Sequence, residues 1–177
     1  MVASVGNELR RDDGAGPAVL AELLDRPVCS SVWCGRLGSP FDLLGLWDGA
    51  QLAVVVDAVR AGGTPGEVHV VELVGLGTSH GSDPEVDPGV ATGTGAAVLA
   101  PASVSSHGTG LVEVLRLARS LGTAPARVML VGIAGSDFGH GAGLSEPVRR
   151  GVGEAAEAVA GLLRAASDAS CARDDGP

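Results

Sequence analysis

The chain has 177 residues, a length that suits one domain burying about 70% of the surface of its unfolded form. Its formal net charge is −9. Because nucleic acid and anionic membranes bind to proteins through clustered cationic side chains, this charge argues against both as partners. Its three cysteines lack CxxC spacing, and neither a signal-peptide pattern nor an apolar run of membrane-spanning length is visible, which predicts a cytoplasmic protein without membrane insertion.

Apolar stretches separated by glycine- and proline-rich turns predict the elements of the first half of the chain. In order, we expect a strand over residues 1–5, a helix over 14–24, a strand over 28–33, a loop over 35–40 and a short helix over 41–47. The continuous apolar run over residues 52–56 is typical of a strand covered on both faces and therefore parallel to its neighbours.

The second half begins with a tight turn at residues 62–66. Because such a turn is too short for a parallel crossover, the alternating segment 67–73 is expected to pair antiparallel. We then expect a helix over 108–121, a buried strand over 127–133, and a last helix capped by Ser145 that ends near Ala166. Residues 75–104 are predicted to form a flexible flap and residues 167–177 a disordered acidic tail.

This order of elements predicts the fold class. Strands and helices alternate, which favours an α/β, three-layer αβα sandwich with a mostly parallel sheet and one antiparallel strand. We expect a single domain over residues 1–166, acting as a monomer.

Three side chains are predicted to share one edge of this sheet. Asp13 lies in an acidic, glycine-rich turn after the first strand, Asp57 follows the most apolar strand, and His107 opens a helix. The carboxyl edge of a parallel sheet is where α/β proteins keep their sites. Two carboxylates and an imidazole leave open positions on a metal ion, as a hydrolytic or metal-sensing site requires.

Each of these residues also has a purely structural interpretation. Asp13 fits a helix cap, Asp57 a turn cap, and His107 a hydrogen-bonding residue at a helix start. Since only one residue holds a cap position, Asp12 is left to face outward or into a site.

The other chemically active residues give weaker signals. We expect the remaining histidines to be exposed rather than chemical; they are His69, His80 and His140. Cys34 precedes Gly35-Arg36, which would lower the pKa of its thiol, although an inert thiol is favoured. Phosphate binding is disfavoured because no GxGxxG or GxxxxGK[ST] motif is present, and no GxSxG elbow supports a serine nucleophile beside His107.

Taken together, the ordered motifs resemble the hydrogenase maturation endopeptidases. The matching stretches are Gly6 to Gly16, Val55 to Val59 with Gly63 to Gly66, Ser105 to Leu111, Val131 to Ile133, and Gly143 to Val148. Each motif alone is weak, whereas the set, in order over roughly residues 4–163, is specific.

The resemblance implies a function. Members of this family remove a C-terminal extension from the large-subunit precursor of nickel-iron hydrogenases after nickel insertion. By position, their metal-binding and catalytic triad corresponds to Asp13, Asp57 and His107, with nickel supplied by the precursor. Gly6, Asn7 and Asp12 of the first motif are the predicted substrate-binding residues. The stretch Cys34-Gly35-Arg36 stands where the family often has Asp-Gly-Gly, so the role of that Asp is absent or altered here.

Two rival functions remain open at this stage. One is a non-catalytic metal-sensing or chaperone module for the precursor, and the other is a small-molecule hydrolase or nucleoside-binding domain whose pocket is closed by the flap. For the peptidase, the sequence leaves open whether the metal polarises the carbonyl or activates water, with a carboxylate moving protons.

Overall fold

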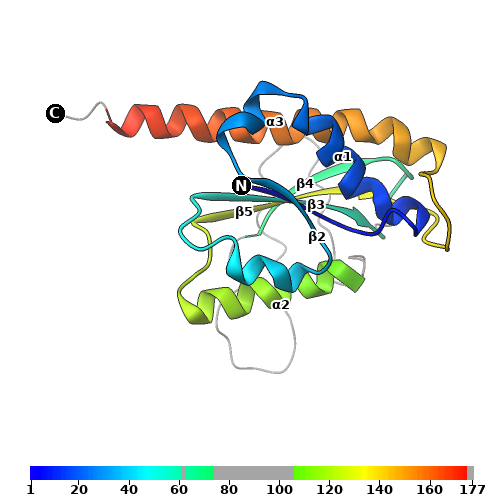
Figure 1. Cartoon of the computed structure of the whole chain (residues 1–177), viewed down its shortest axis with the longest axis horizontal. Coiled ribbons are helices and arrows are strands. Elements are labelled where there is room, and N and C mark those ends of the chain that lie inside the picture. Colours follow the sequence, from blue (N-terminus) through cyan, green and yellow to red (C-terminus); the bar gives the residue numbers. More distant parts are fainter. Residues whose placement is uncertain (61–62, 74–105, 175–177) are drawn as a thin grey trace.

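The computed structural model describes residues 1–60, 63–73 and 106–174; the side chains of 106–109 and 170–174, and the predicted flap over 75–104, lie outside the description (Figure 1). Its strands are β1 (Val2–Val5), β2 (Cys34–Leu37), β3 (Leu52–Val59), β4 (Val68–Glu72) and β5 (Arg127–Ala134). The α-helices are α1 (Ala15–Leu24), α2 (Ser106–Leu121) and α3 (Glu146–Asp174), and the 3₁₀ helices are η1 (Arg11–Gly14), η2 (Pro27–Ser31) and η3 (Pro40–Gly45).

The strands form one sheet in the order β2-β1-β3-β5-β4. The first three pairings are parallel, and β4 pairs antiparallel with β5. Helices α1 and α3 cover one face, while α2 and η3 cover the other (Figure 1). The predicted α/β sandwich with one antiparallel strand is therefore confirmed.

The central strand β3 explains this layering. All eight of its residues are buried, and they alternate between the two faces. Val54, Val56 and Ala58 pack with α1 and α3, whereas Ala53 and Val55 pack with α2. A strand buried on both faces needs helices on both sides, so its apolar run determines the sandwich.

The position of the second strand was predicted wrongly. Residues Pro27–Ser31 form η2, for which a proline at the start is favourable, and the strand instead occupies Cys34–Leu37, which overlaps the loop predicted over 35–40. The apolar side chains Val28, Cys29 and Val32 still pack against the core beside α1 and α3. Pairing with β1, in the register Val2↔Cys34, fixes the strand, and that partner lies 32 residues away (34 − 2).

The last helix is longer than predicted. Helix α3 continues through residues 167–174, which were expected to belong to the tail, and ends at Asp174. Alanine recurs in this stretch and has the highest intrinsic helix propensity, so the helix continues beyond the core. No helix in the described ranges is long and apolar enough to span a membrane.

A close backbone contact seats α1 on the sheet. A Cβ atom at Gly16 would lie 2.4 Å from the carbonyl oxygen of Val5 and 2.7 Å from that of Val56. These backbone oxygens cannot move without disturbing β1 and β3. Only glycine therefore allows the first turn of α1 to approach the ends of these strands.

We expect Gly16→Ala to lower the free energy of unfolding by about 1–3 kcal/mol, because the added methyl group overpacks this contact. Urea unfolding followed by circular dichroism measures the change. The control is Gly161→Ala in α3, where a Cβ meets nothing within 4 Å and should stabilise the helix by about 0.5–1 kcal/mol. Equal stability changes in the two variants would contradict this account of Gly16.

Candidate functional site

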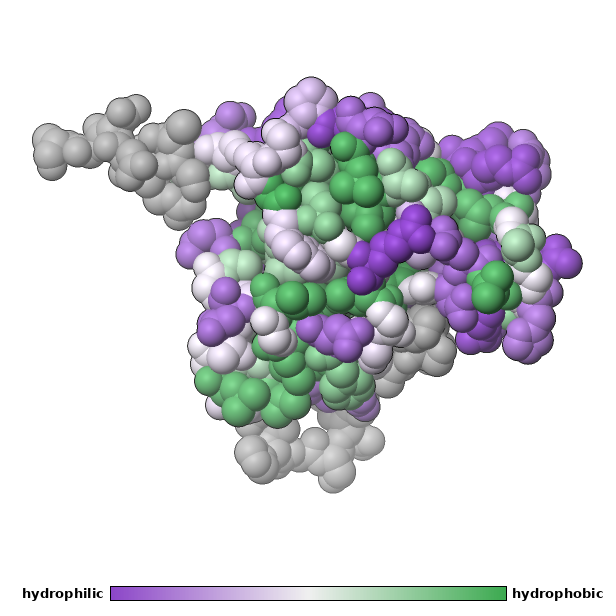
Figure 2. All heavy atoms as spheres, viewed as in Figure 1, coloured by the Kyte–Doolittle hydropathy of each residue, from purple (hydrophilic) through white to green (hydrophobic). Residues whose placement is uncertain are grey.

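The carboxyl ends of three parallel strands define the edge that carries the predicted site. Strands β1, β3 and β5 end at Val5, Val59 and Ala134, and η1, the β3–β4 turn and the β5–α3 loop (residues 135–145) follow them. These segments lie together at the right-hand end of Figure 1. Figure 2 shows mostly hydrophilic surface at this end of the molecule.

Asp13 lies in η1 and is 3% exposed. The backbone N–H of Asn7 donates to both its Oδ2 and its carbonyl oxygen, each at 3.2 Å. Gly6 has a φ of +131°, and a Cβ there would lie 2.1 Å from the carbonyl oxygen of Asp13, so only glycine fits. Gly14 rather than Asp13 occupies the cap position of α1, which removes the predicted capping alternative. Gly6 and Asn7 thus hold Asp13 in place.

Asp57 lies inside β3 rather than directly after it, because the ladder with β5 continues to the pair Val59↔Ala134. It is 3% exposed and pairs with Gly132. By the alternation of the strand, its side chain is on the face that packs against α2. Since η1 packs against β3, the two predicted acidic residues occupy neighbouring elements at one edge.

His107 is the second residue of α2. A five-residue link, 122–126, joins the end of α2 to the start of β5, so α2 runs back across the sheet and begins at the edge where β3 ends (Figure 1). The backbone of His107 is therefore at the predicted edge, while its side chain lies outside the described residues. Among the side chains that are described, no three acidic, histidine or cysteine residues gather closely enough to bind a metal ion, so the predicted site depends on His107.

A cleft opens beside Asp13, with a volume of about 520 Å³. Its lining residues come from the first motif, the first turn of α1 and the end of β2; they are Gly6, Asn7, Glu8, Leu9, Pro17, Arg36 and Gly38. Arg36 and Glu8 form an ion pair across it at 2.7 Å, with both side chains at least half exposed. The cleft is thus a polar groove next to Asp13, which Gly6 and Asn7 contact.

The structure differs from the sequence interpretation at His69. This residue was expected to be exposed, yet it is 3% exposed and neither ring nitrogen has a hydrogen-bond partner among the described residues. His69, Gly132 and Asp57 stand side by side in the register of three adjacent strands. Alternation along residues 67–73 indicated a half-exposed strand but not which face was covered. His140 is exposed, as expected, and His80 lies outside the described residues.

Asp12 is fully buried. Burial alone would raise the pKa of its carboxyl, but hydrogen bonds from Ser145, Asp137 and Ser136 outweigh that effect and lower the pKa. The donors include the backbone N–H groups of all three residues, so the carboxylate of Asp12 is enclosed by the chain. Asp12 is therefore buried and hydrogen-bonded within the fold, whereas a substrate-binding side chain is expected to be exposed.

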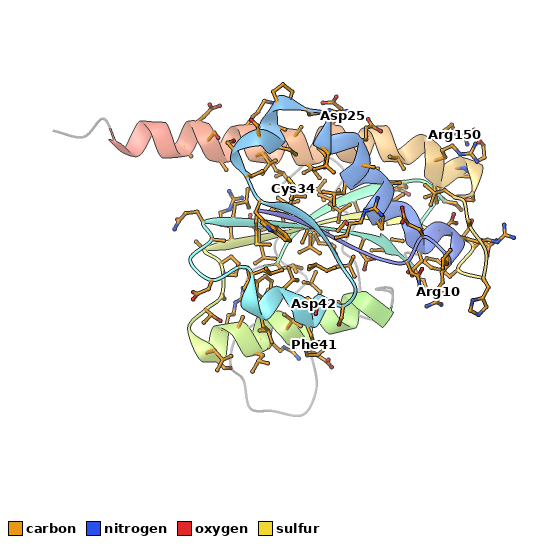
Figure 3. All side chains as sticks on the ribbon, viewed as in Figure 1. Arg10, Asp25, Cys34, Phe41, Asp42 and Arg150 are labelled. Atoms are coloured by element: carbon orange, nitrogen blue, oxygen red, sulfur yellow. The ribbon has the colours of Figure 1, made fainter. Side chains whose placement is uncertain are left out.

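Cys34 lies at the start of β2, at the opposite end of the sheet from Arg10 and η1 (Figure 3). Burial, a hydrogen bond with Cys29 and the proximity of that thiol raise the pKa of Cys34 to about 12. The expected lowering of this pKa by Arg36 is not found, and the guanidinium of Arg36 pairs with Glu8. The thiol is therefore protonated at neutral pH, in line with the favoured inert interpretation.

Comparison with known proteins identifies the family that this chain resembles. The family model for hydrogenase maturation protease matches residues 95–162, while no curated protein sequence matches. The hydrogenase maturating endopeptidase HybD from E. coli is 25% identical, with coverage of 93% of this chain and 91% of that chain and a TM-score of 0.66. An endopeptidase from Escherichia coli is 26% identical, with 93% of each chain covered and a TM-score of 0.70.

An archaeal structure shares the fold. The [NiFe] hydrogenase maturation protease HybD from Thermococcus kodakarensis is 24% identical over 92% of this chain and 98% of that chain, with a TM-score of 0.63. The resemblance to hydrogenase maturation endopeptidases that the motifs indicated is thereby confirmed.

We expect His69→Phe to raise the free energy of unfolding by about 1–2 kcal/mol, because an apolar ring of similar shape replaces two buried nitrogen atoms that have no hydrogen-bond partner within the described ranges. Chemical denaturation measures the change, with the exposed His140→Phe as a control near zero. A destabilised His69→Phe variant would contradict this account of the buried imidazole.

We expect Cys34 to react slowly with iodoacetamide at pH 8, because the thiolate is the reactive form and the pKa of this thiol is raised to about 12. Peptide mapping by mass spectrometry over a pH series measures the rate, which should rise about tenfold for each pH unit up to that pKa. A rate equal to that of free cysteine at pH 8 would contradict the raised pKa.

Proposed function

We propose, on the premise that this chain is a hydrogenase maturation protease, that it removes the C-terminal extension of a nickel-iron hydrogenase large-subunit precursor after nickel insertion. The family model and the endopeptidases of similar structure support the general activity. The observation that carries the proposal is the placement of two buried carboxylates from separate motifs, Asp13 and Asp57, at the sheet edge where α2 begins. We place the reaction in the cytoplasm.

Asp13, Asp57 and His107 are the proposed contacts to the nickel of the precursor. Two carboxylates and one imidazole form a small ligand set without thiolates, so their own affinity for nickel is modest. Modest affinity suits recognition of a metal that the precursor already holds. Binding then brings the scissile peptide into register, and a precursor without nickel is left unanchored.

The cleft beside Asp13 is the proposed path for the precursor's C-terminal segment. It begins at Gly6 and Asn7, which contact Asp13 directly, and continues to Arg36 and Gly38 at the end of β2. The missing side chain of Gly6 makes room for the carbonyl oxygen of Asp13, so this end of the cleft is in direct contact with that residue. Of the three predicted substrate-binding residues, Gly6 and Asn7 line this cleft, whereas Asp12 is enclosed by the protein.

The chemistry proposed for the site is hydrolysis with proton transfer by a carboxylate. Water adds to the scissile carbonyl carbon, the C–N bond breaks, and one proton of the water passes to the leaving nitrogen. Asp13 or Asp57 accepts that proton and returns it, acting first as general base and then as general acid.

A non-catalytic precursor chaperone is the alternative class of function. It predicts binding of the nickel-loaded precursor without a change in its mass. Intact-mass spectrometry of the precursor, mixed with the purified protein, separates the two, because the peptidase releases the C-terminal peptide.

We expect His107→Ala to lower the rate of precursor cleavage by at least about 100-fold, because it removes a contact to the nickel and leaves the peptide out of register. The circular dichroism spectrum should stay unchanged. His140→Ala is the matched control, since that histidine is exposed in the β5–α3 loop, and it should cleave like the unmodified protein. Full cleavage by His107→Ala would remove this residue from the mechanism.

A further inference from the structure

The consecutive acids of the first motif have different surroundings. Asp13 touches Gly6 and Asn7 beside the cleft, whereas Asp12 turns into the protein toward the β5–α3 loop. A buried carboxylate is tolerated only when donors satisfy its oxygen atoms. The identity of those donors indicates what Asp12 does.

All the donors to Asp12 come from the β5–α3 loop and the residue before α3. The backbone N–H groups of Ser136 and Asp137 donate to Oδ2, each at 2.9 Å, and that of Ser145 donates to Oδ1 at 2.7 Å. The hydroxyl groups of Ser145 and Ser136 donate to Oδ2 at 3.0 and 3.4 Å. Ser145, expected to cap α3 with its side chain, thus gives that hydroxyl to Asp12, whose charge also suits the positive end of the helix.

Backbone hydrogen bonds join the same two segments, the residues before Asp13 and the β5–α3 loop. The N–H of Asp12 donates to the carbonyl oxygen of Asp137, and Arg11 and Leu9 exchange hydrogen bonds with Gly141, all at 2.9 Å. Arg11 has a φ of +48°, a left-handed conformation that costs a non-glycine residue energy and persists only where its surroundings impose it. The segment before Asp13 is therefore held in a strained shape by this loop.

The contact between these two segments also connects the predicted acidic ligands Asp13 and Asp57. Ser136 follows Gly135, whose N–H donates to the carbonyl oxygen of Val59 at 2.9 Å. Val59 is the last residue of β3, two positions beyond Asp57. A continuous path of hydrogen bonds and backbone thus joins Asp13, through Asp12 and the loop, to the strand that carries Asp57.

We infer that Asp12 is a positioning residue: its carboxylate, bound to Ser136, Asp137 and Ser145, fixes the place of Asp13 relative to Asp57 for the cleavage reaction. This inference rests on the proposed function. Asp12 has no contact with the substrate in this role. It acts through the backbone of its neighbour, so its loss misplaces Asp13 without removing a reacting group.

Asp12→Asn provides the test, since it keeps the size of the side chain but turns an NH₂ group toward N–H donors. Cleavage of nickel-loaded precursor should lose about 100-fold in kcat, the effect of a displacement on the order of 1 Å, while KM stays within about twofold. The N–H of Asn7, which donates to Oδ2 of Asp13, should exchange with deuterium about tenfold faster in NMR spectra. Asp25→Asn, an exposed aspartate at the end of α1 (Figure 3), is the matched control and should change neither value.

A kcat within about threefold of the unmodified protein, or unchanged exchange at Asn7, would overturn the inference. If Asp12→Asn does not fold, Ser145→Ala replaces it, because that variant removes one donor and should show a smaller loss of the same kind. Wild-type kcat and exchange in a folded Ser145→Ala variant would then count against the positioning role. If the unmodified protein does not cleave the precursor, the proposed function fails, and the exchange at Asn7 alone decides the role of Asp12.

Discussion

The site depends on how closely the first turn of α1 approaches the ends of β1 and β3. At Gly16 the helix lies against the carbonyl oxygens of Val5 and Val56, with no room for a side chain. This contact places η1, and with it Asp13, over the end of the strand that carries Asp57. A helix held one side chain farther from the sheet would separate the two carboxylates, so the spacing of glycines in the first motif is a requirement of the site as well as of the turn.

Asp12 and His69 are both buried near this edge, but they differ in the hydrogen bonds that their polar atoms make. Asp12 is satisfied by several donors and ties together segments 124 to 133 residues apart, so its burial organises the loop. His69 is equally enclosed, but its ring nitrogens have no partner among the described residues. An unpaired buried group costs roughly 1–3 kcal/mol, whereas a paired one contributes to stability. The edge thus combines a carboxylate bound by several donors with an imidazole that has no partner in the part of the chain that the structure describes.

Local patterns were sufficient to predict most of the fold. The apolar run from Leu52 indicates a strand covered on both faces, and the alternation after residue 66 indicates a strand covered on one face. Strand β2 was misplaced because its four residues, partly exposed, acquire their position from β1. The shared edge of Asp13, Asp57 and the start of α2 followed from parallel topology. The partners of Asp12 and the burial of His69 did not, because they arise from contacts across distant segments.

The stretch Cys34-Gly35-Arg36, which stands where the family often has Asp-Gly-Gly, lies at the margin of the candidate site. Cys34 pairs with Val2, at the amino end of the parallel strands, while Asp13 follows the other end of β1 and Asp57 lies level with that end in β3. The three residue steps from Cys34 to Leu37 span about 10 Å, which separates the thiol from the proposed chemistry. Arg36 is closer to the edge and forms the ion pair with Glu8 across the cleft. Exposed ion pairs contribute little stability, so this pair matters little for the fold. Under the proposed function, it sets the charge that the precursor's C-terminal segment meets in the cleft, and the altered motif then bears on which precursor is admitted, while Asp13 and Asp57 keep their places.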